Sequence, residues 1–418
     1  MIFKINSELC LIKYYLYLIL ILVCAYFKSL GADFVFDLKI PEDISLMEQT
    51  KEFVEQYQNK RSTEASTKSG KHTILTSACP GWICYAEKTH GSWILPYISR
   101  VKSGQQIMGS IVKQHLSKTL RVSSSDIIHV TVMPCFDKKL EGKKYEGPLS
   151  HYSLLTFNKY SSLNLFLILL FLTASRPDFT DQATGQKEVD LVITTVEVEQ
   201  MLSEDGYKTL ENVIYQRDKS IDSLAKVLKT STNLEDIESK KIYLNHGSGS
   251  GGHAENVLVM ASKELFGKEI SFDDLKIKTL KNSDFKEIIL ENSSGEAMLR
   301  FAIANGFRNI QNLVQKMKRK KCSYDLVEVM ACPSGCLNGG AQCKPSEEKD
   351  LSFKAFIAEM EKLYSADIDG KCMPTNNPDV KVIYDDWLGG VNTEKSAHYL
   401  HTEYHEVEKM TNSLAIKW

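Results

Sequence analysis

Short runs of apolar, often β-branched residues alternate with amphipathic segments along most of this chain. Each run is too brief for a helix, so we expect a strand at each of them. The runs are residues 73–77, 127–133, 189–194 and 324–330. Apolar residues at helical spacing predict a long helix over 307–320 and a shorter one over 196–202. Alternating strands and helices are typical of a mainly parallel sheet covered by helices, so the sequence predicts an α/β fold.

Three regions differ from this pattern. Residues 14–27 carry no charge, but they are fewer than the about 20 residues that a membrane-spanning helix needs. They could be the apolar core of a secretory signal, a buried helix, or residues foreign to the protein. Residues 163–172 form a second apolar run, without helical period, inside a polar stretch. From about residue 352 the chain becomes polar and helical, with helices expected over 353–364 and 393–410, and we interpret it as a small C-terminal appendage.

Composition narrows the possible functions. The 51 Lys and Arg nearly balance the 53 Asp and Glu, so we expect neither nucleic acid nor an anionic membrane as a partner. Hydrophobic residues at 43% and charged residues at 25% are typical of a globular protein. A length of 418 residues predicts two or three domains, or one large domain with two lobes. Ten cysteines are too few for a disulfide scaffold, so their clustering beside Gly and Pro favours metal binding or catalysis.

Four cysteines follow three of the predicted strands. Cys79 lies in the segment 76–82, Cys135 in 133–139, and Cys332 with Cys336 in 328–340. In parallel sheets ligands bind beyond the carboxyl ends of the strands, where these motifs are expected to lie. Four thiolates suit either zinc or a [4Fe–4S] cluster, but zinc ligands normally come as two local pairs. Two of these cysteines are isolated in the sequence, so a fold must gather them.

The three motifs resemble those of iron-only hydrogenases, and more closely those of the hydrogenase-like cytosolic iron–sulfur cluster assembly factors, also called the nuclear prelamin A recognition factor-like family. The resemblance runs from about Gly31 to Trp418 and skips residues 142–173. It implies a two-lobed fold like the iron-only hydrogenase large domain, with a cluster between the lobes, plus a small helical C-terminal appendage. It also implies that the matching Cys79, Cys135, Cys332 and Cys336 are both the metal ligands and the cofactor-binding residues.

Two departures from the hydrogenase pattern limit the expected chemistry. Hydrogenases have a proton-relaying cysteine at the position of Ala78, and alanine has no titratable group. Lys138 and Glu141 match positions that hydrogenases carry, so the lobe could survive without the reaction. The family's N-terminal region holds a second cluster through four cysteines, whereas this chain has only Cys10 and Cys24 there. We therefore expect one [4Fe–4S] cluster in this chain and no catalytic residues.

The resemblance implies a non-enzymatic component of the cytosolic iron–sulfur protein assembly machinery. Such a protein binds a cluster and bridges the scaffold assembly proteins to the targeting complex that delivers clusters to apoproteins. The alternatives are an iron-only hydrogenase-type oxidoreductase and a nuclear prelamin A-binding relative. The expected location is the cytoplasm, with the nucleus as a second one. A terminal aromatic residue with a free carboxylate suits capture by a partner, although the ring of Trp418 could instead pack on the chain's own core. The resemblance favours docking and implies that Trp418 contacts the WD40-repeat protein of the targeting complex.

The expected domain boundaries follow from the same comparison. Residues 1–30 are outside the family resemblance, 31–350 form the large-subunit-like domain with the insert 142–173, and 351–418 form the small-subunit-like region. A truncated or mis-spliced gene model explains both 1–30 and the insert. The glycine-rich segment 247–252 lacks the Lys-Ser/Thr pair of a phosphate-binding loop, so we expect it to pack against the cluster site. The sequon at Asn292 has meaning only in a secreted chain.

Overall fold

The computed structural model describes residues 20–63, 73–141, 187–205, 221–229, 243–344, 352–365 and 370–407. The chain divides into two compact units, each assembled from three separate stretches of sequence. Unit 1 comprises Met1–Met47, Gly104–Gly252 and Cys336–Leu400. Unit 2 comprises Glu48–Ser103, His253–Gly335 and His401–Trp418.

Unit 2 contains a five-stranded sheet in the order β1-β7-β6-β5-β4. Its strands are β1 (Ile74–Thr76), β4 (Ile277–Thr279), β5 (Phe285–Glu291), β6 (Ala297–Asn305) and β7 (Leu326–Met330). The strand β7 pairs in parallel with β1 and β6, whereas β5 pairs antiparallel with β4 and β6. The expectation of a mainly parallel sheet is therefore wrong for the outer half of this sheet.

A tight turn accounts for the antiparallel half. The sequence Asn292–Ser294, which matches a glycosylation sequon, forms the hairpin between β5 and β6. The amide of Gly295 donates to the carbonyl of Asn292 at 3.1 Å, and Gly295 has a φ of +80°. Only glycine adopts that backbone region at no steric cost, so the residue after the sequon allows the chain to reverse.

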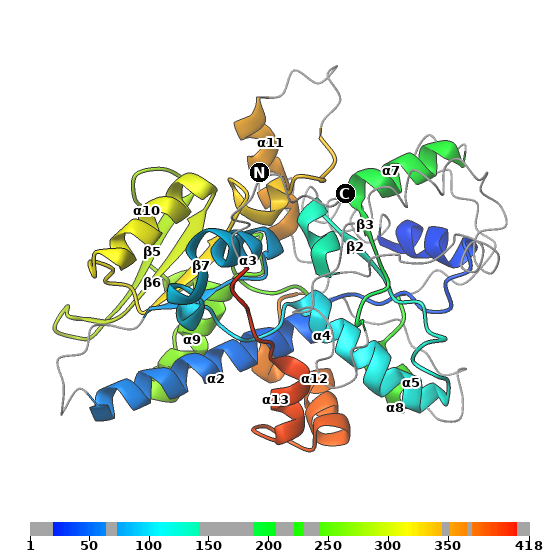
Figure 1. Ribbon diagram of the computed structural model, residues 1–418, viewed down its shortest axis with the longest axis horizontal. Coiled ribbons are helices and arrows are strands. Elements are labelled where there is room, and N and C mark those ends of the chain that lie inside the picture. Colours follow the sequence, from blue (N-terminus) through cyan, green and yellow to red (C-terminus); the bar gives the residue numbers. More distant parts are fainter. Residues whose placement is uncertain are drawn as a thin grey trace, which may run out of the picture. The chain divides into compact units, whose positions relative to one another are not determined.

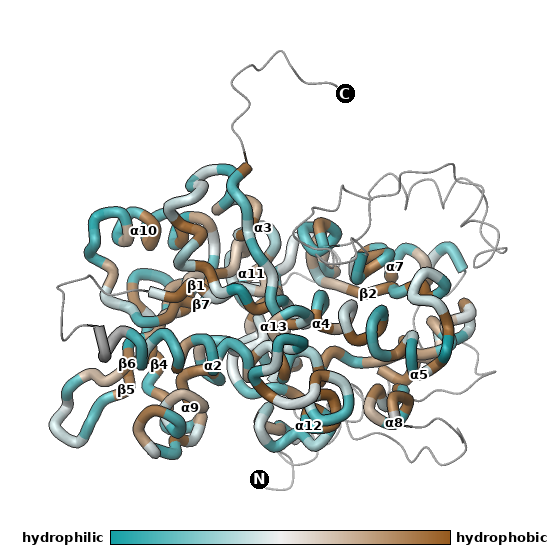
Figure 2. The backbone as a smooth tube through the Cα atoms, turned by 60° about the horizontal axis from the view of Figure 1, so that its bottom comes forward, coloured by the Kyte–Doolittle hydropathy of each residue, from teal (hydrophilic) through white to brown (hydrophobic). Residues whose placement is uncertain are grey.

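Helices cover both faces of this sheet. Figure 1 shows α9 (His253–Phe266) and α10 (Phe307–Lys318) on opposite sides of it. On the α9 side, buried residues of α9 and α2 (Lys39–Thr63) form one apolar cluster with the strands, and the rings of Phe53 and Phe301 meet at 4.9 Å. Along α10, Figure 2 shows hydrophobic residues alternating with hydrophilic ones. This periodicity, which predicted the helix, buries Leu313 and Val314.

Unit 1 is built around a short parallel pair of strands, β2 (Val130–Met133) and β3 (Leu191–Thr194). The helix α7 (Thr195–Glu204) follows β3 directly because Thr194 and Glu197 form a reciprocal capping box at its start. Further α-helices among the described residues of this unit are α4 (Gly104–Ser110), α5 (Ser117–Leu120), α8 (Leu224–Lys229), α11 (Phe353–Ser365), α12 (Pro378–Val382) and α13 (Glu394–Leu400). The π-helical segments Ile111–Leu116 and Ile383–Leu388 continue α4 and α12.

The predicted helix over 393–410 is too long. The helix α13 ends at Leu400, and His401 then forms an antiparallel bridge with Val101. The amide of Thr402 donates to the carbonyl of Arg100 at 2.8 Å. Pairing with another strand-like segment, which sequence periodicity does not reveal, therefore replaces the helix from residue 401 onward.

The N-terminal segment is helical over residues 20–29, and one face of this helix is buried, with Leu22, Cys24 and Tyr26 at 2% exposure or less. Tyr26 is 0% exposed, and it packs with Ile193 and Met201 of unit 1. Lys28 forms a buried ion pair with Asp222 at 3.2 Å. Among the described residues, none of the helices combines the length and apolarity that a membrane span requires. The insert 142–173 lies outside the described residues.

If the segment 20–29 is part of the folded core, Tyr26→Ala should destabilise the protein strongly. Truncation of a buried aromatic side chain removes apolar burial and leaves a cavity, so we expect a loss of about 3–5 kcal/mol in the free energy of unfolding. The exposed neighbour Ser29 provides the control, because Ser29→Ala should cost about 1 kcal/mol or less. Urea unfolding followed by circular dichroism measures both. Equal midpoints for the two variants would show that the segment does not belong to the folded core.

Candidate metal centre

Cys79 and Cys332 follow the neighbouring strands β1 and β7 of unit 2. These strands are parallel and in register, with Thr76 opposite Glu328. Cys79 comes three residues after Thr76, and Cys332 comes four residues after Glu328. Because neighbouring parallel strands end at the same edge of a sheet, both cysteines lie beyond that edge, as their sequence positions predicted.

Cys79 is held by its own backbone. It is the N-cap residue of α3 (Pro80–Tyr85), and proline at the first helical position favours the start of the helix there. The amide of Cys79 donates to Ser77 Oγ at 3.0 Å, and Ser77 Oγ donates to the carbonyl of Val329 on β7 at 2.5 Å. Cys79 is 8% exposed. Ser77 thus links the backbone of Cys79 to the neighbouring strand β7.

Cys332 begins a turn that requires an unusual backbone. Ser334 and Gly335 have φ values of +60° and +70°. The amide of Gly335 donates to the carbonyl of Cys332 at 3.1 Å, and the amide of Ser334 donates to Asp284 Oδ1 at 2.6 Å. Serine pays a steric penalty in the left-handed region, and the charged acceptor Asp284 offsets it.

Cys135 lies in the loop after β2, and Cys336 lies in the short 3-10 helix Gly335–Asn338. The chain after this helix contacts the loop that carries Cys135. The amide of Ala341 donates to the carbonyl of Pro134 at 3.1 Å, and the amide of Gly339 donates to the carbonyl of Cys336 at 2.9 Å. A Cβ atom on Gly339 would lie 2.2 Å from the carbonyl oxygen of Pro134. Glycine is therefore required for the loop after Cys336 to approach the loop that carries Cys135.

The glycine-rich segment 247–252 packs against the same region of unit 1. The amide of Cys336 donates to Ser250 Oγ at 3.0 Å. A Cβ atom on Gly249 would lie 2.3 Å from Leu337 Cδ1. These contacts agree with a packing role for the segment at the Cys336 turn.

Amide donors and charged groups surround Cys135. The amide of Asp137 donates to Cys135 Sγ at 3.3 Å, a hydrogen bond that favours the thiolate over the thiol. Lys138 Nζ forms an ion pair with Glu141 at 3.1 Å. These are the two residues expected to match hydrogenase positions, and their side chains pair with each other. Ala78 places no titratable group beside Cys79.

The described residues contain no group of three or more His, Cys, Asp or Glu side chains in a metal-binding arrangement. The structure instead places two of the predicted ligands in each unit, Cys79 with Cys332 and Cys135 with Cys336. The donor set fits an iron–sulfur cluster: all four groups are sulfur, one already accepts an amide hydrogen bond, and Gly339 admits a close backbone approach.

Sequence reasoning missed a buried polar cluster on the α9 face of the sheet, close to the strand ends that carry Cys79 and Cys332. Glu328 is 0% exposed, and its Oε2 accepts from the amide of Ala254 at 2.8 Å. Thr76 Oγ1 donates to Gln49 Oε1 at 2.6 Å, and that oxygen lies 3.0 Å from His253 Nδ1. The signal that could have found this cluster is a single charged residue inside the apolar run Leu326–Met330.

The protonation of Glu328 is unusual. Burial, and after it the neighbouring Glu255 carboxylate, raise the pKa of the Glu328 carboxyl from its usual 4.5 to about 8. The amide of Ala254 acts in the opposite direction because it favours the charged form. Burial and the Glu255 charge thus both favour the neutral acid of Glu328 over its carboxylate.

Comparison with known proteins places these features in a family. Residues 21–157 and 172–340 match the iron only hydrogenase large subunit, C-terminal domain, and residues 356–407 match the iron hydrogenase small subunit. The first match begins ten residues before Gly31, where the resemblance was expected to start.

The chain also resembles solved structures and curated proteins over nearly its whole length. An apo [FeFe]-hydrogenase from Chlamydomonas reinhardtii superimposes with a TM-score of 0.68 at 22% identity, covering 92% of this chain and 87% of that one. This likeness shows the two-lobed hydrogenase-like fold and nothing about activity.

Among curated proteins, a probable cytosolic Fe-S cluster assembly factor of Aedes aegypti is 42% identical over 95% of this chain and 71% of its own length. Cytosolic iron-sulfur assembly component 3 of Rattus norvegicus is 41% identical over 94% of this chain and 71% of its own. Identity at this level across the whole α/β fold, with the cysteine motifs in place, shows that the chain belongs to the hydrogenase-like family of cytosolic iron–sulfur cluster assembly factors.

Proposed function

We propose that this protein binds one [4Fe–4S] cluster and works in cytosolic iron–sulfur protein assembly, where it links the scaffold proteins to the targeting complex. The observation that carries the proposal is the pairing of four cysteines at strand ends and turns: Cys79 with Cys332, and Cys135 with Cys336. The names of the related assembly factors support the process and a cytoplasmic location. A nuclear location and the boundaries at 30/31 and 350/351 stay predictions.

The four thiolates are proposed to ligate a single cubane, which would supply a one-electron redox centre or a cluster to be transferred. The chain's own contribution is to hold the sulfur atoms and to stabilise their negative charge. Cys79 is fixed through Ser77, Cys336 through Ser250, and the Cys135 sulfur accepts the amide of Asp137. Zinc is the competing occupant, since it also takes four thiolates.

We infer a non-enzymatic role. Hydrogen production needs a proton donor beside the metal, and Ala78 cannot act as one. The hydrogenase alternative rests on the fold and on the retained pair Lys138 and Glu141, whose Nζ and carboxylate already pair with each other. A gas-evolution assay on reconstituted protein separates the two functions. A pulldown that compares lamin tails with assembly proteins distinguishes prelamin A binding from a role in iron–sulfur assembly.

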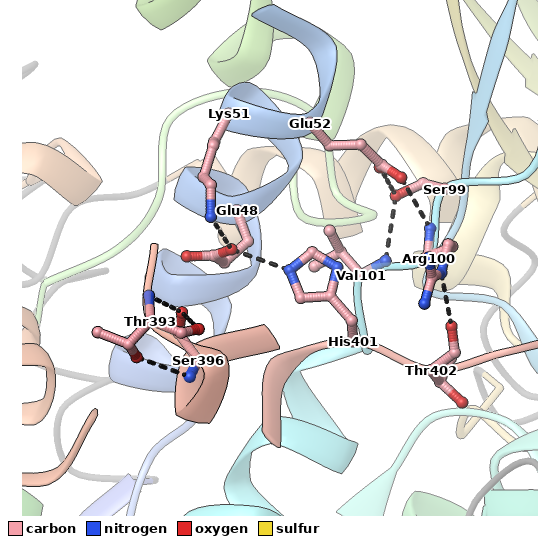
Figure 3. A network of polar contacts seen from close by, with 10 residues as sticks. All are labelled: Glu48, Lys51, Glu52, Ser99, Arg100, Val101, Thr393, Ser396, His401 and Thr402. Atoms are coloured by element: carbon pink, nitrogen blue, oxygen red, sulfur yellow. Dashed lines mark hydrogen bonds and ion pairs between the residues drawn. The ribbon is translucent and has the colours of Figure 1, made fainter. Parts of the chain in front are cut away.

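The C-terminal segment offers a physical basis for partner binding through Trp418, which itself lies outside the described residues. Figure 3 shows the imidazole of His401 pointing at Glu48, and Arg100 beside Thr402. His401 Nε2 lies 2.9 Å from the buried carboxylate of Glu48, and Arg100 Nε donates to the carbonyl of Thr402. Arg100 Nη2 also pairs with Glu403 at 3.1 Å. The chain is thus anchored to unit 2 just before its last residues.

A second set of contacts extends this anchor. The amide of Ser92 donates to Glu406 Oε2 at 3.2 Å, and the amide of His405 donates to Glu87 Oε1 at 3.2 Å. Because residues 401–406 are held in this way, the eleven residues after 407 begin from a defined point on unit 2. We propose that they present Trp418 to the WD40-repeat partner of the targeting complex.

The cluster prediction concerns iron content. Anaerobically purified protein should hold about four iron atoms per chain, and Cys332→Ala or Cys336→Ala should abolish most of this content because each removes one of four ligands. The matched control is Cys84→Ala, which removes a thiol outside the proposed set. Iron analysis and the visible absorption spectrum measure the result. Zinc without iron, in protein made under iron-replete anaerobic conditions, contradicts the proposal.

The docking prediction concerns Trp418. Removal of this residue should leave the iron content and the melting temperature unchanged, while pulldown of the targeting complex falls at least tenfold, because an aromatic anchor typically contributes 2 kcal/mol or more. The control is Lys417→Ala, which keeps the aromatic ring and the terminal carboxylate. A truncated protein that loses iron or melts earlier, and still binds its partner, would show that Trp418 packs within the protein instead.

A further inference from the structure

Glu328 occupies a position in which a charge is costly. It lies in the middle of β7, and its cross-strand neighbours in the sheet are Thr76 on β1 and Ile303 on β6. Its Oε2 accepts from the amide of Ala254 at the start of α9, whereas its Oε1 has no hydrogen-bond partner among the described residues. An ionised carboxylate that is 0% exposed and half-satisfied is unstable unless a cation neutralises it.

No cation does so within the described part of the chain. Lys286 on β5 is opposite Ile303 on β6, which in turn is opposite Glu328 on β7. The lysine is therefore two strands away from Glu328. The other groups that face Glu328 come from α9. The charge of the buried Glu255 opposes ionisation of Glu328, whereas the backbone of His253 favours it, and His253 Nδ1 is engaged with Gln49. Burial and Glu255 outweigh the favourable contributions, so Glu328 and Glu255 form a buried acid pair that holds a proton more tightly than an exposed carboxyl does.

The acid pair lies within electrostatic range of the proposed ligands. Cys332 is four residues beyond Glu328 along the chain, which is roughly 13 Å at the rise of an extended strand. In the protein interior, charges at such a separation still interact appreciably, because little water screens them. A change of charge at the cysteines therefore changes the proton affinity of the pair.

We propose that the buried acid pair Glu328–Glu255 takes up a proton when the cluster is reduced and releases it on oxidation. The inference rests on the proposed function, because it requires a cluster at Cys79 and Cys332. One electron comes from a one-electron donor, and one proton comes from solvent to convert the Glu328 carboxylate to the acid. No bond to the metal forms or breaks. Glu328 would act on the cluster only through its charge and is not proposed as a ligand.

The sign of the effect defines the pH window. With the oxidised cluster the pair loses its proton near pH 8, in line with the pKa of Glu328, and the added negative charge of the reduced cluster moves this loss to higher pH. Below the window Glu328 is protonated in both states, so the midpoint potential is independent of pH. Above about pH 8 reduction binds a proton, so the potential falls as pH rises.

The test is a redox titration of the iron-loaded protein from pH 6 to pH 10, followed by visible absorption. The wild type should show a constant potential up to about pH 7. Above about pH 8 the reduction equilibrium should fall by up to tenfold per pH unit, which is about 59 mV for one electron. Glu328→Gln, which keeps the shape but cannot gain a proton, should show a constant potential throughout. Glu255→Gln should move the onset to lower pH, because it removes the repelling charge.

The control is Glu264→Gln on the exposed side of α9, which should keep the wild-type profile. Equal melting temperatures and iron contents identify variants that are folded and loaded. An iron-loaded wild type with a constant potential at all pH values, or a Glu328→Gln variant with the wild-type slope, overturns the inference and leaves the proposed function standing. A wild type that binds no iron contradicts both.

Discussion

The parallel pairing of β1 with β7 is the constraint on which the candidate site depends. These strands come from stretches of sequence about 250 residues apart, and register pairing of Thr76 with Glu328 brings Cys79 and Cys332 to one edge of the sheet. The hydrogen bond from Ser77 to Val329 repeats this link beyond the last ladder pair. In unit 1 the contact between Pro134 and Gly339 does the same for the other two cysteines. Each pair of proposed ligands is thus positioned by hydrogen bonds to the backbone or by close backbone contacts.

The same strand pairing carries an electrostatic cost. Glu328 lies on β7, an interior strand of the five-stranded sheet, where every residue of the strand is buried. A sheet needs no charge there for stability, and an apolar residue would pack without any penalty for desolvation. The amide of Ala254 favours the carboxylate of Glu328, and the charge of Glu255 favours the acid. The proton affinity of this carboxyl therefore depends on the charges near it. This is the physical reason to connect it with a redox centre rather than with folding alone.

Much of the sheet and the positions of the cysteines could be predicted from the sequence. The runs 73–77, 127–133, 189–194 and 324–330 are confirmed as β1, β2, β3 and β7, because continuous β-branched runs are strong signals for buried strands. The strands β4 and β5 escaped notice. All of β4 is exposed, and β5 mixes Lys and Glu with its apolar residues, so neither stands out from an amphipathic loop. The end of α13 at Leu400 depends on pairing with Val101, which no local pattern encodes.

Part of the candidate site could likewise be predicted from the sequence, and part could not. Cysteines beside Gly and Pro at strand ends were visible in the sequence, as was the loss of the proton relay at Ala78. The acceptor Ser250, the donor Asp137 and the raised pKa of Glu328 depend on residues brought together only by the fold. Glu328 and its donor Ala254 are separated by more than 70 residues, so the chemistry of this carboxyl could not be derived from its neighbours in sequence.

The central claim is that the four cysteines hold one cubane cluster in a single chain. Native mass spectrometry of anaerobically isolated protein tests it most directly, because it weighs the bound group without assuming its identity. If the four cysteines hold one cubane, we expect one species that is heavier than the apoprotein by four iron and four sulfide atoms. This species should be lost when any of the four cysteines is replaced by alanine. A mass increase that matches zinc, or an iron–sulfur species that persists after removal of Cys79 or Cys135, would contradict it.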